Sequence, residues 1–365
     1  MKRSLIFVVL AVAVWCQAQI PQKGIVVDLP KMFQEVDEAI AESPKFIRQH
    51  EERIEKEKQA LDTVKTDNGR LLLQMQLYHL YVGFNGDSTL SYAIRTAETA
   101  RRLELTDIEA DYHARAAYLC TFLGSQTEAL TLLKQIDKRL LSSDGIGYYY
   151  RAYLSAYESL ADNCKTAELR KTFRRQHLRY RDSLLRAVPE NSELYYFYYE
   201  DKLIKEGKVK QALKMNDERL NQAGPGAHED AIIAYSRYRI YEKNGNKELA
   251  IYWLCRSALA DIRNAVMDQM SLITLAKVLD KEGDYERASR YISFTWESNR
   301  RYSPHMRSWQ IAPLLSAIED NYQSRIDEKN RQLTMYTIAF LVLVIALLAR
   351  NMFRRKKKDS EQEGE

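Results

Sequence analysis

Apolar residues recur every three or four positions along most of the chain, in segments that end at regularly spaced glycines. Gly86, Gly124, Gly207, Gly245 and Gly283 are separated by 38, 83, 38 and 38 residues, and 83 is close to twice 41. Such apolar spacing is that of an amphipathic helix, and a glycine in the left-handed conformation is a common helix end. The pattern predicts a stack of helical hairpins in which each of these glycines closes a first helix.

A small residue follows most of these glycines at a fixed distance. Four alanines lie five residues after a glycine, at 129, 212, 250 and 288, whereas Gly86 is followed by Ala93 at seven. An alanine at this place on the second helix lets the two helix axes approach closely. We therefore expect six helix pairs, at about residues 68–105, 107–141, 145–187, 190–222, 228–262 and 264–300. The third pair lacks the glycine, and Asp162-Asn163-Cys164 is its expected turn.

Residues 30–64 precede the first pair and also have a helical pattern, which Ser43-Pro44 is expected to interrupt. Three apolar residues spaced by seven among charged ones form a narrow stripe suited to covering the first pair: Ile47, Ile54 and Leu61. Gly224-Pro225-Gly226 predicts the clearest loop, which divides the pairs into two groups.

An apolar segment of membrane-spanning length lies near the end of the chain. Leu333–Ala349 has no charged residue over 17 positions, and Met352 and Phe353 extend the segment to 333–353. About 20 residues are needed to cross a bilayer as a helix. Basic residues follow at 354–358, and by the positive-inside rule they stay in the cytoplasm.

A juxtamembrane helix is expected before this span, with a start or a kink near Pro313. Its apolar residues follow spacings of three and four: Ile311, Leu315, Ile318, Tyr322 and Ile326. One interpretation of this pattern is a homodimer held through residues 311–326 and the transmembrane helix.

The first 18 residues have the pattern of a secretory signal peptide. Lys2 and Arg3 precede the 11-residue apolar stretch Leu5–Trp15, which is too short to span a bilayer. Cys16-Gln17-Ala18 supplies a cleavage site before Gln19. Lipid attachment at Cys16 and an uncleaved N-terminal anchor are the alternatives.

These segments together predict a single-pass type I membrane protein with its main domain outside the cytoplasm. The expected order is a signal peptide (1–18), an N-terminal helical segment (19–67), helical repeats (68–302), a juxtamembrane helix (303–332), a transmembrane helix (333–353) and a short basic-then-acidic cytoplasmic tail (354–365).

Composition and charge narrow the possible functions. Glycine (13 of 365) and proline (7) occur at about half their usual level or less, which favours helices. The net charge of +5 comes mostly from the two ends, with +2 from Lys2 and Arg3 and +2 from residues 350–365. The remaining +1 gives the main domain no basic surface for a nucleic-acid backbone, so nucleic acid is not an expected partner.

No group of residues in the sequence predicts catalysis, a metal or a cofactor. There is no GxSxG, GxGxxG or phosphate-binding loop, so we expect neither an enzyme nor a cofactor. The histidines show no metal-ligand spacing: His50, His79, His113, His177, His228 and His305. Cys120 and Cys255 fall in amphipathic helices and are expected as buried free thiols, with a disulfide as the alternative, whereas Cys164 is the one expected at the surface.

Tyrosine is abundant, with 24 residues, and it is clustered at 148–150 and 195–199. Successive residues of a helix turn by about 100°, so such runs cannot face one core. Tyrosine joins an apolar ring to a polar tip, which suits it to interfaces. The candidate partner-binding residues are Tyr148, Tyr149, Tyr195, Tyr196, Tyr198 and Tyr199. The alternative is that repeat stacking buries most of them.

Parts of the chain resemble known repeats. Gly245–Trp253 and Gly283–Tyr291 resemble the turn and second helix of a tetratricopeptide repeat (TPR), and Leu275 and Ala276 fit its first helix. Phe84–Tyr92, the charged helix before it and the stretch 241–322 resemble a poorly characterised family of bacterial membrane-anchored TPR-like proteins. Its members have a signal peptide, periplasmic helical repeats and one transmembrane helix, and longer members carry a cytoplasmic helix-turn-helix regulator domain.

The resemblance implies the bacterial inner membrane, with the repeat domain in the periplasm. Together with the residues it predicts an all-α, TPR-like hairpin solenoid that binds a protein or peptide in its groove, as a scaffold or a sensory domain. The alternatives are an accessory subunit of an envelope export or assembly complex, or a sensor related to one-component transcriptional regulators. The sequence stops about a dozen residues after the span, where such regulators carry an output domain.

Overall fold

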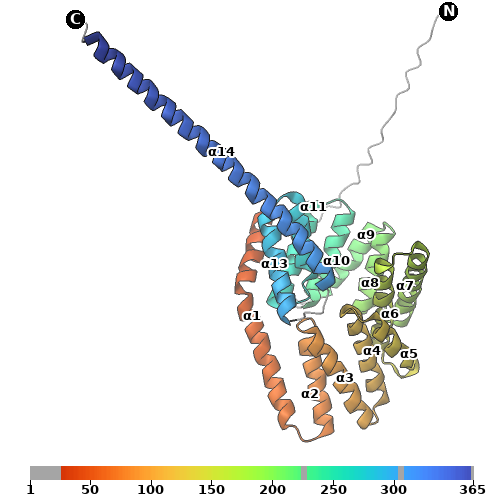
Figure 1. The fold of residues 1–365 in the computed structure, drawn as a ribbon. Coiled ribbons are helices and arrows are strands. Elements are labelled where there is room, and N and C mark those ends of the chain that lie inside the picture. Colours follow the sequence, from red (N-terminus) through yellow and green to blue (C-terminus); the bar gives the residue numbers. More distant parts are fainter. Residues whose placement is uncertain (1–25, 223–227, 303–307, 363–365) are drawn as a thin grey trace, which may run out of the picture.

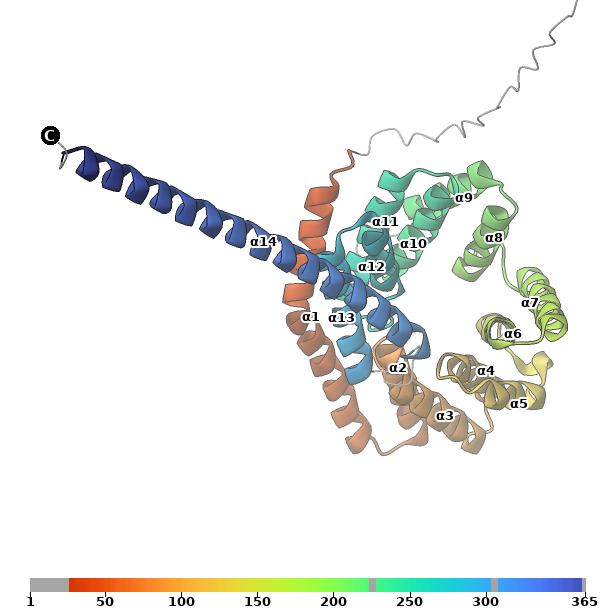
Figure 2. The ribbon, with the colours of Figure 1, turned by 45° about the horizontal axis from the view of Figure 1, so that its top comes forward.

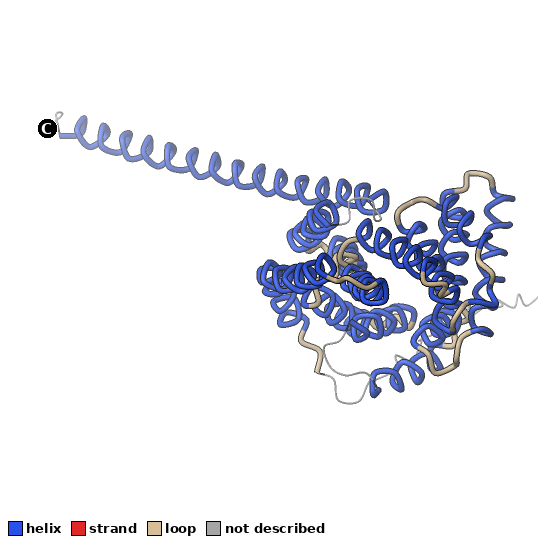
Figure 3. Tube along the Cα trace, turned by 90° about the horizontal axis from the view of Figure 1, so that it is seen from below, coloured by secondary structure: helices blue, strands red, loops and turns tan. Residues whose placement is uncertain are grey.

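The computed structural model describes residues 26–222, 228–302 and 308–362, and these ranges contain helices but no strand (Figures 1 and 3). The predicted fold class, an all-α solenoid of helical hairpins followed by a single apolar helix, is confirmed. The predicted signal peptide and the predicted loop at Gly224-Pro225-Gly226 lie outside the described residues.

Six hairpins follow one another in the described part of the chain. They are α2 (Asp67–Tyr81) with α3 (Gly86–Arg102), α4 (Thr106–Phe122) with α5 (Gln126–Gln135), α6 (Ser143–Asn163) with α7 (Ala167–Ala187), α8 (Glu193–Lys205) with α9 (Val209–Gln222), α10 (His228–Lys243) with α11 (Lys247–Arg263), and α12 (Met270–Glu282) with α13 (Tyr285–Tyr302). A short 3₁₀ turn, η1 (Lys138–Leu140), follows α5. The long helices α1 (Leu29–Thr63) and α14 (Ser308–Gln362) flank the hairpins.

Left-handed glycines stand between the two helices of most hairpins. Four predicted turn glycines have φ between +74° and +87°: Gly124, Gly207, Gly245 and Gly283. The prediction for Gly86 was wrong, because the residue with positive φ (+76°) in this turn is Gly83. Gly86 is instead the first residue of α3, whose start is capped by the Asn85 side chain accepting a hydrogen bond from the Ser88 amide at 2.8 Å.

The alanines that follow these glycines are almost completely buried, with exposed fractions of 4% or less: Ala93, Ala129, Ala212, Ala250 and Ala288. Each lies on the second helix of its hairpin. A side chain of one methyl group at this place keeps the two helices close, so a larger residue would force them apart.

The first helix, α1, continues through Ser43-Pro44 without a break, so the predicted interruption was wrong. A proline inside a helix removes one hydrogen bond and crowds the carbonyl of the preceding turn, a local cost of about 3 kcal/mol. Here the residues on both sides of Pro44 are anchored in separate cores, Val36 and Ala39 before it and Ile54 after it. This burial keeps the two halves on one helix.

The N-terminal half of α1 packs against the last hairpins. Met32, Val36 and Ala39 share a core with Trp253 of α11 and Tyr291 of α13. Polar contacts reinforce this packing. The Arg287 guanidinium on α13 pairs with the Asp37 carboxylate at 3.2 Å, and the Tyr291 hydroxyl donates to the Phe33 carbonyl at 3.4 Å.

The C-terminal half of α1 covers the first hairpin, where Ile54 lies in a core with Leu77 and Tyr78 of α2. The predicted stripe is present, with Ile47 and Leu61 packed against the same core. His50, on the same half, donates from Nε2 to the Leu80 carbonyl at 2.7 Å. Because α1 contacts both the first and the last hairpins, it joins the two ends of the solenoid.

The two ends of the repeat stack also touch directly. The Met267 amide, in the loop between α11 and α12, donates to the Gly83 carbonyl at 2.6 Å, and the rings of Phe84 and Tyr302 lie 4.9 Å apart. Figure 2 shows the resulting arrangement, in which the hairpins form a ring and α1 lies where its ends meet. The solenoid is therefore a closed ring, where the sequence had suggested an open groove.

The last helix, α14, starts on the ring and continues far beyond it (Figure 1). Ile311 and Ile318 are buried in the core that includes α12 and α13, and the Asn321 amide donates to the Asp280 carboxylate at 3.0 Å. Pro313 lies within the helix, which begins at Ser308. Among the described residues, Ile311–Met352 is the one stretch long and apolar enough to cross a membrane, and its most apolar window is not buried in the protein.

We predict that Val36→Ala lowers the free energy of unfolding by about 2 kcal/mol, because it removes two buried methyl groups and leaves a cavity. Val36 is 0% exposed, whereas Val26 is 88% exposed, so Val26→Ala is a matched control that should change stability little. Urea unfolding of the full-length protein in detergent, followed by circular dichroism, measures both. Equal effects of the two substitutions would contradict the role given to α1.

Candidate functional site

The first helices of the early hairpins line the inner side of the ring. Figure 2 shows α2, α4, α6 and α8 nearer to the centre, with α3, α5, α7 and α9 outside them. A pocket of about 290 Å³ lies among α4, α6, α7 and α8. This is the pocket that contains one of the predicted tyrosines, Tyr198.

A row of alternating arginine and tyrosine side chains connects α2, α4 and α6. Arg115 on α4 lies over the rings of Tyr78, Tyr112 and Tyr148, at 5.3, 5.3 and 4.3 Å from the ring centroids. The guanidinium is also paired with the Asp144 carboxylate. Each cation–π contact of this kind contributes about 0.5–2 kcal/mol, so the row helps to fix the spacing of the first helices.

Arg151 on α6 continues the row into the pocket. Its guanidinium lies 4.2 Å from the ring centroid of Tyr118 and 5.3 Å from that of Tyr148, and Nη2 donates to the Tyr118 hydroxyl at 2.5 Å. Tyr198 on α8 lines the same pocket as Arg151. Arg151 thus brings together aromatic side chains from three successive first helices. We call Arg115, Tyr148, Arg151, Tyr118 and Tyr198 the arginine–tyrosine row.

The pocket around Arg151 combines aromatic walls with charged ends. Phe122 and Phe197 line it beside Tyr118 and Tyr198. Glu158 and Asp162, further along α6, are exposed and also line it. His177 on α7 reaches the pocket with its Nδ1 donating to the Leu154 carbonyl at 3.1 Å. Burial raises the pKa of Tyr198 above its usual range, so its hydroxyl stays protonated near neutral pH.

Two of the predicted tyrosines, Tyr148 and Tyr198, meet at Arg151. Tyr149 is 8% exposed in a core with Leu133 and Tyr153, against which Tyr148 also packs. Its role is therefore packing between hairpins, as the alternative interpretation of the tyrosine runs had it.

The remaining predicted tyrosines are half-buried and lie apart from Arg151. Tyr195 and Tyr199 stack on each other at 5.2 Å, and Tyr195 also packs against the core formed by α6 and α7. Tyr196 lies 5.8 Å from the guanidinium of Arg219, which pairs with Glu200 at 2.7 Å. The run at 195–199 is thus divided between the pocket and the contacts of α8 with its neighbours.

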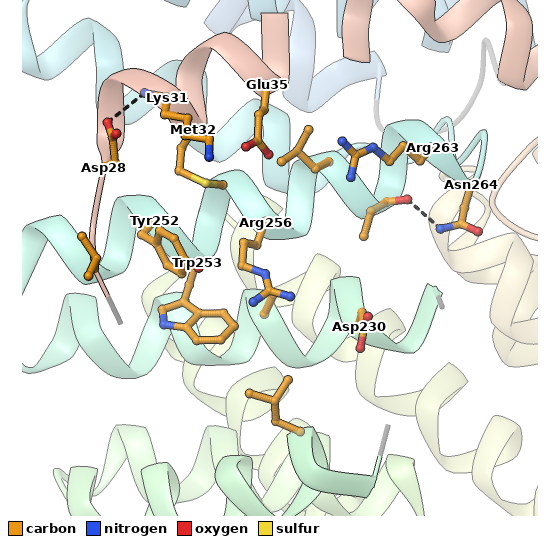
Figure 4. Close-up of a pocket in the computed structure, with 15 residues that line it drawn as sticks. Asp28, Lys31, Met32, Glu35, Asp230, Tyr252, Trp253, Arg256, Arg263 and Asn264 are labelled. Carbon is orange, nitrogen blue, oxygen red and sulfur yellow. Dashed lines mark hydrogen bonds between the residues drawn. The ribbon is translucent and has the colours of Figure 1, made fainter. Parts of the chain in front are cut away.

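A second, larger pocket of about 570 Å³ lies among α1, α9, α10 and α11 (Figure 4). Figure 4 shows Arg256 beside the indole of Trp253, and Glu35 of α1 nearby. Charged residues of both signs line it, and none of the six predicted tyrosines does. We assign this pocket to the joint that closes the ring.

The comparison with known families agrees with this architecture. A family model described as the SusR N-terminal TPR domain matches residues 40–313, which is 274 of the 365 residues. The chain belongs to this family. The match covers most of α1, all six hairpins and the start of α14, and it confirms the predicted TPR-like bacterial family. No curated protein matches the chain.

A TPR-type domain is typically a scaffold for protein–protein interaction and not an enzyme. Over the ranges that the structure describes, no three His, Cys, Asp or Glu side chains are grouped so that they could hold a metal ion. Cys120 and Cys255 of this SusR-type domain are buried and Cys164 is half-buried, and all three are free. Burial raises the pKa of the Cys120 thiol to about 12, so it is not a reactive thiolate at neutral pH.

Sequence reasoning missed the two arginines of the row. Tyr112-x-x-Arg115 and Tyr148-x-x-Arg151 are separated by 36 residues, close to the glycine period. Residues three apart share one side of a helix, so this repeated pair predicts a continuing row on the inner helices. The signal in the sequence is therefore the repeated Tyr-x-x-Arg spacing.

We predict that Tyr149→Ala lowers the free energy of unfolding by about 3–5 kcal/mol, because a buried aromatic side chain is removed from a core. Tyr196→Ala removes a half-buried ring and should cost clearly less. Thermal and urea unfolding of the two variants would separate core from surface roles. An equal loss in both would show that Tyr196 is also a core residue.

Proposed function

We propose that this chain is a single-span protein of the bacterial inner membrane whose repeat ring lies in the periplasm and holds a polypeptide segment in the pocket around Arg151. The observation that carries this proposal is the meeting of Tyr118, Phe197 and Tyr198, from two different first helices, in one pocket. A TPR-type domain supports a protein partner in general.

The aromatic side chains would act as anchors for an extended segment. A tyrosine or phenylalanine offers a large rigid contact area at little cost in conformational entropy, and few such residues dominate most interfaces. Of the six predicted tyrosines, we propose Tyr198, which lines the pocket, as an anchor at Arg151. The half-buried Tyr148, Tyr195, Tyr196 and Tyr199 are candidates for the rim. Tyr149 contributes through packing.

A role as a sensor is the second candidate, and one observation favours it. α14 is one helix from its contacts with α12 and α13 through the apolar span, so a movement of the last hairpin would be carried into the membrane. Ile311, Leu315 and Ile318 pack on the ring, so we limit the proposed self-association to Tyr322, Ile326 and the span.

Partner binding predicts a localised loss in one variant. Tyr198→Ala should weaken binding of the partner by about 2 kcal/mol or more, roughly thirtyfold. Because Tyr198 also packs against the core of Leu154 and Leu184, the variant should lose some stability but stay folded. A photo-crosslinking amino acid at Phe197 in intact cells should give an adduct with one envelope protein, and Tyr198→Ala should abolish it. Tyr285 lies outside this pocket and is the control position. The crosslinking amino acid at position 285 and the substitution Tyr285→Ala are the two control variants. The same adducts at both positions, or no effect of Tyr198→Ala, would contradict the proposal.

The proposed orientation can be tested by cysteine labelling in spheroplasts. In a Cys164→Ser background, a membrane-impermeant maleimide should label Arg139→Cys, whose side chain is exposed on η1. It should not label Ser360→Cys, which follows the basic residues after the span. Ready labelling of position 360 in sealed spheroplasts would overturn the type I topology.

A further inference from the structure

Arg151 differs from the buried arginines of this protein in having no acidic partner. Arg115 pairs with Asp144, Arg219 with Glu193 and Glu200, and Arg237 with Asp217. Among the residues that the structure describes, no carboxylate pairs with Arg151, which is half-buried. Its Nε is buried without a hydrogen-bond acceptor, as are those of the three paired arginines. A guanidinium withdrawn from water is costly unless an anion compensates it.

The guanidinium of Arg151 is nevertheless held in place and kept charged. Burial disfavours the charged form of a guanidinium, but an arginine side chain is so basic that it stays protonated in proteins. The rings of Tyr118 and Tyr148, whose centroids lie 4.2 and 5.3 Å from the guanidinium carbon, fix the plane of the group. An ordered guanidinium in a partly closed pocket is preorganised for a carboxylate, which it can bind through two parallel hydrogen bonds.

The opposite end of the pocket carries negative charge. Glu158 lies seven residues after Arg151 on α6, which at 1.5 Å per residue places their backbones about 10 Å apart along the helix. Asp162 lies one turn further, and both acids are exposed. Phe122 and Phe197 line the pocket as well, so the site has a cationic end, aromatic walls and an anionic end.

We propose that the pocket binds a peptide carboxylate at Arg151 and a lysine or arginine side chain of the same peptide at Glu158 and Asp162. This rests on the proposed function and names the chemistry of the segment that the ring holds. The carboxylate is either the C-terminus of the partner or an aspartate or glutamate side chain. The separation of about 10 Å between the backbones of Arg151 and Glu158 corresponds to roughly three residues of extended chain.

The experiment uses the full-length protein in nanodiscs and a library of random short peptides displayed with free C-termini. Enriched peptides are then synthesised in three forms: as selected, with Asp and Glu changed to Asn and Gln, and with the C-terminus amidated. Fluorescence anisotropy should show a tenfold to hundredfold loss of affinity for one of the two acid-free forms, which identifies the source of the carboxylate.

The protein variants test the assignment to Arg151. Arg151→Gln should bind all three forms equally and weakly, Arg151→Lys should keep part of the preference, and Glu158→Gln should remove the preference for a basic residue. Arg139→Gln, at an exposed arginine paired with Asp137, is the matched control and should bind like the unchanged protein. If Arg151→Gln fails to fold, the peptide forms with the unchanged protein and Arg151→Lys still decide.

The outcomes separate this inference from the proposed function. Enriched peptides that lose affinity with Tyr198→Ala but are indifferent to their own carboxylates and to Arg151→Gln would overturn the inference and leave the proposed function intact. Peptides that bind Tyr198→Ala unchanged would contradict the proposed function itself. A library that yields no enriched peptide would contradict both.

Discussion

The packing of α1 against both ends of the repeat stack is the contact on which the rest of the structure depends. Neighbouring hairpins in a solenoid contact only each other, and small rotations between them accumulate into curvature. Nothing in that nearest-neighbour packing brings the first hairpin to the last. Here one helix buries Val36 against the last hairpins and Ile54 against the first, and Asp37 pairs with Arg287 across a sequence separation of 250 residues. The ring follows from this long-range contact.

Features set by neighbouring residues could be predicted from the sequence. The turn glycines at Gly124, Gly207, Gly245 and Gly283 have the expected backbone conformation, because a helix end needs a residue that accepts positive φ. The wrong prediction at Gly86 has a local origin too. Gly83 and Gly86 could both take positive φ in this turn, and Gly83 is the one that does. Spacing alone does not tell which of two nearby glycines takes the left-handed position.

The continuity of α1 and the closure of the ring could not be predicted in the same way. Pro44 would end many helices, and part of the burial that outweighs it comes from residues more than 200 positions away in sequence, on α11 and α13. For the same reason the sequence locates the tyrosine runs but does not predict which tyrosines are buried and which line a pocket. Tyr149 enters a core and Tyr198 reaches a pocket because of the neighbours that each meets after folding.

Closure also fixes the number of repeats. An open solenoid can gain or lose a hairpin at little cost, because each unit touches only those beside it. In this ring an additional unit of about 38 residues would separate Gly83 from Met267 and carry α11 and α13 away from a 35-residue helix of constant length. Duplication or deletion of a hairpin would therefore break the joint between the two ends of the ring. Proteins that evolve from this domain are expected to keep the number of hairpins and to vary in their surface residues.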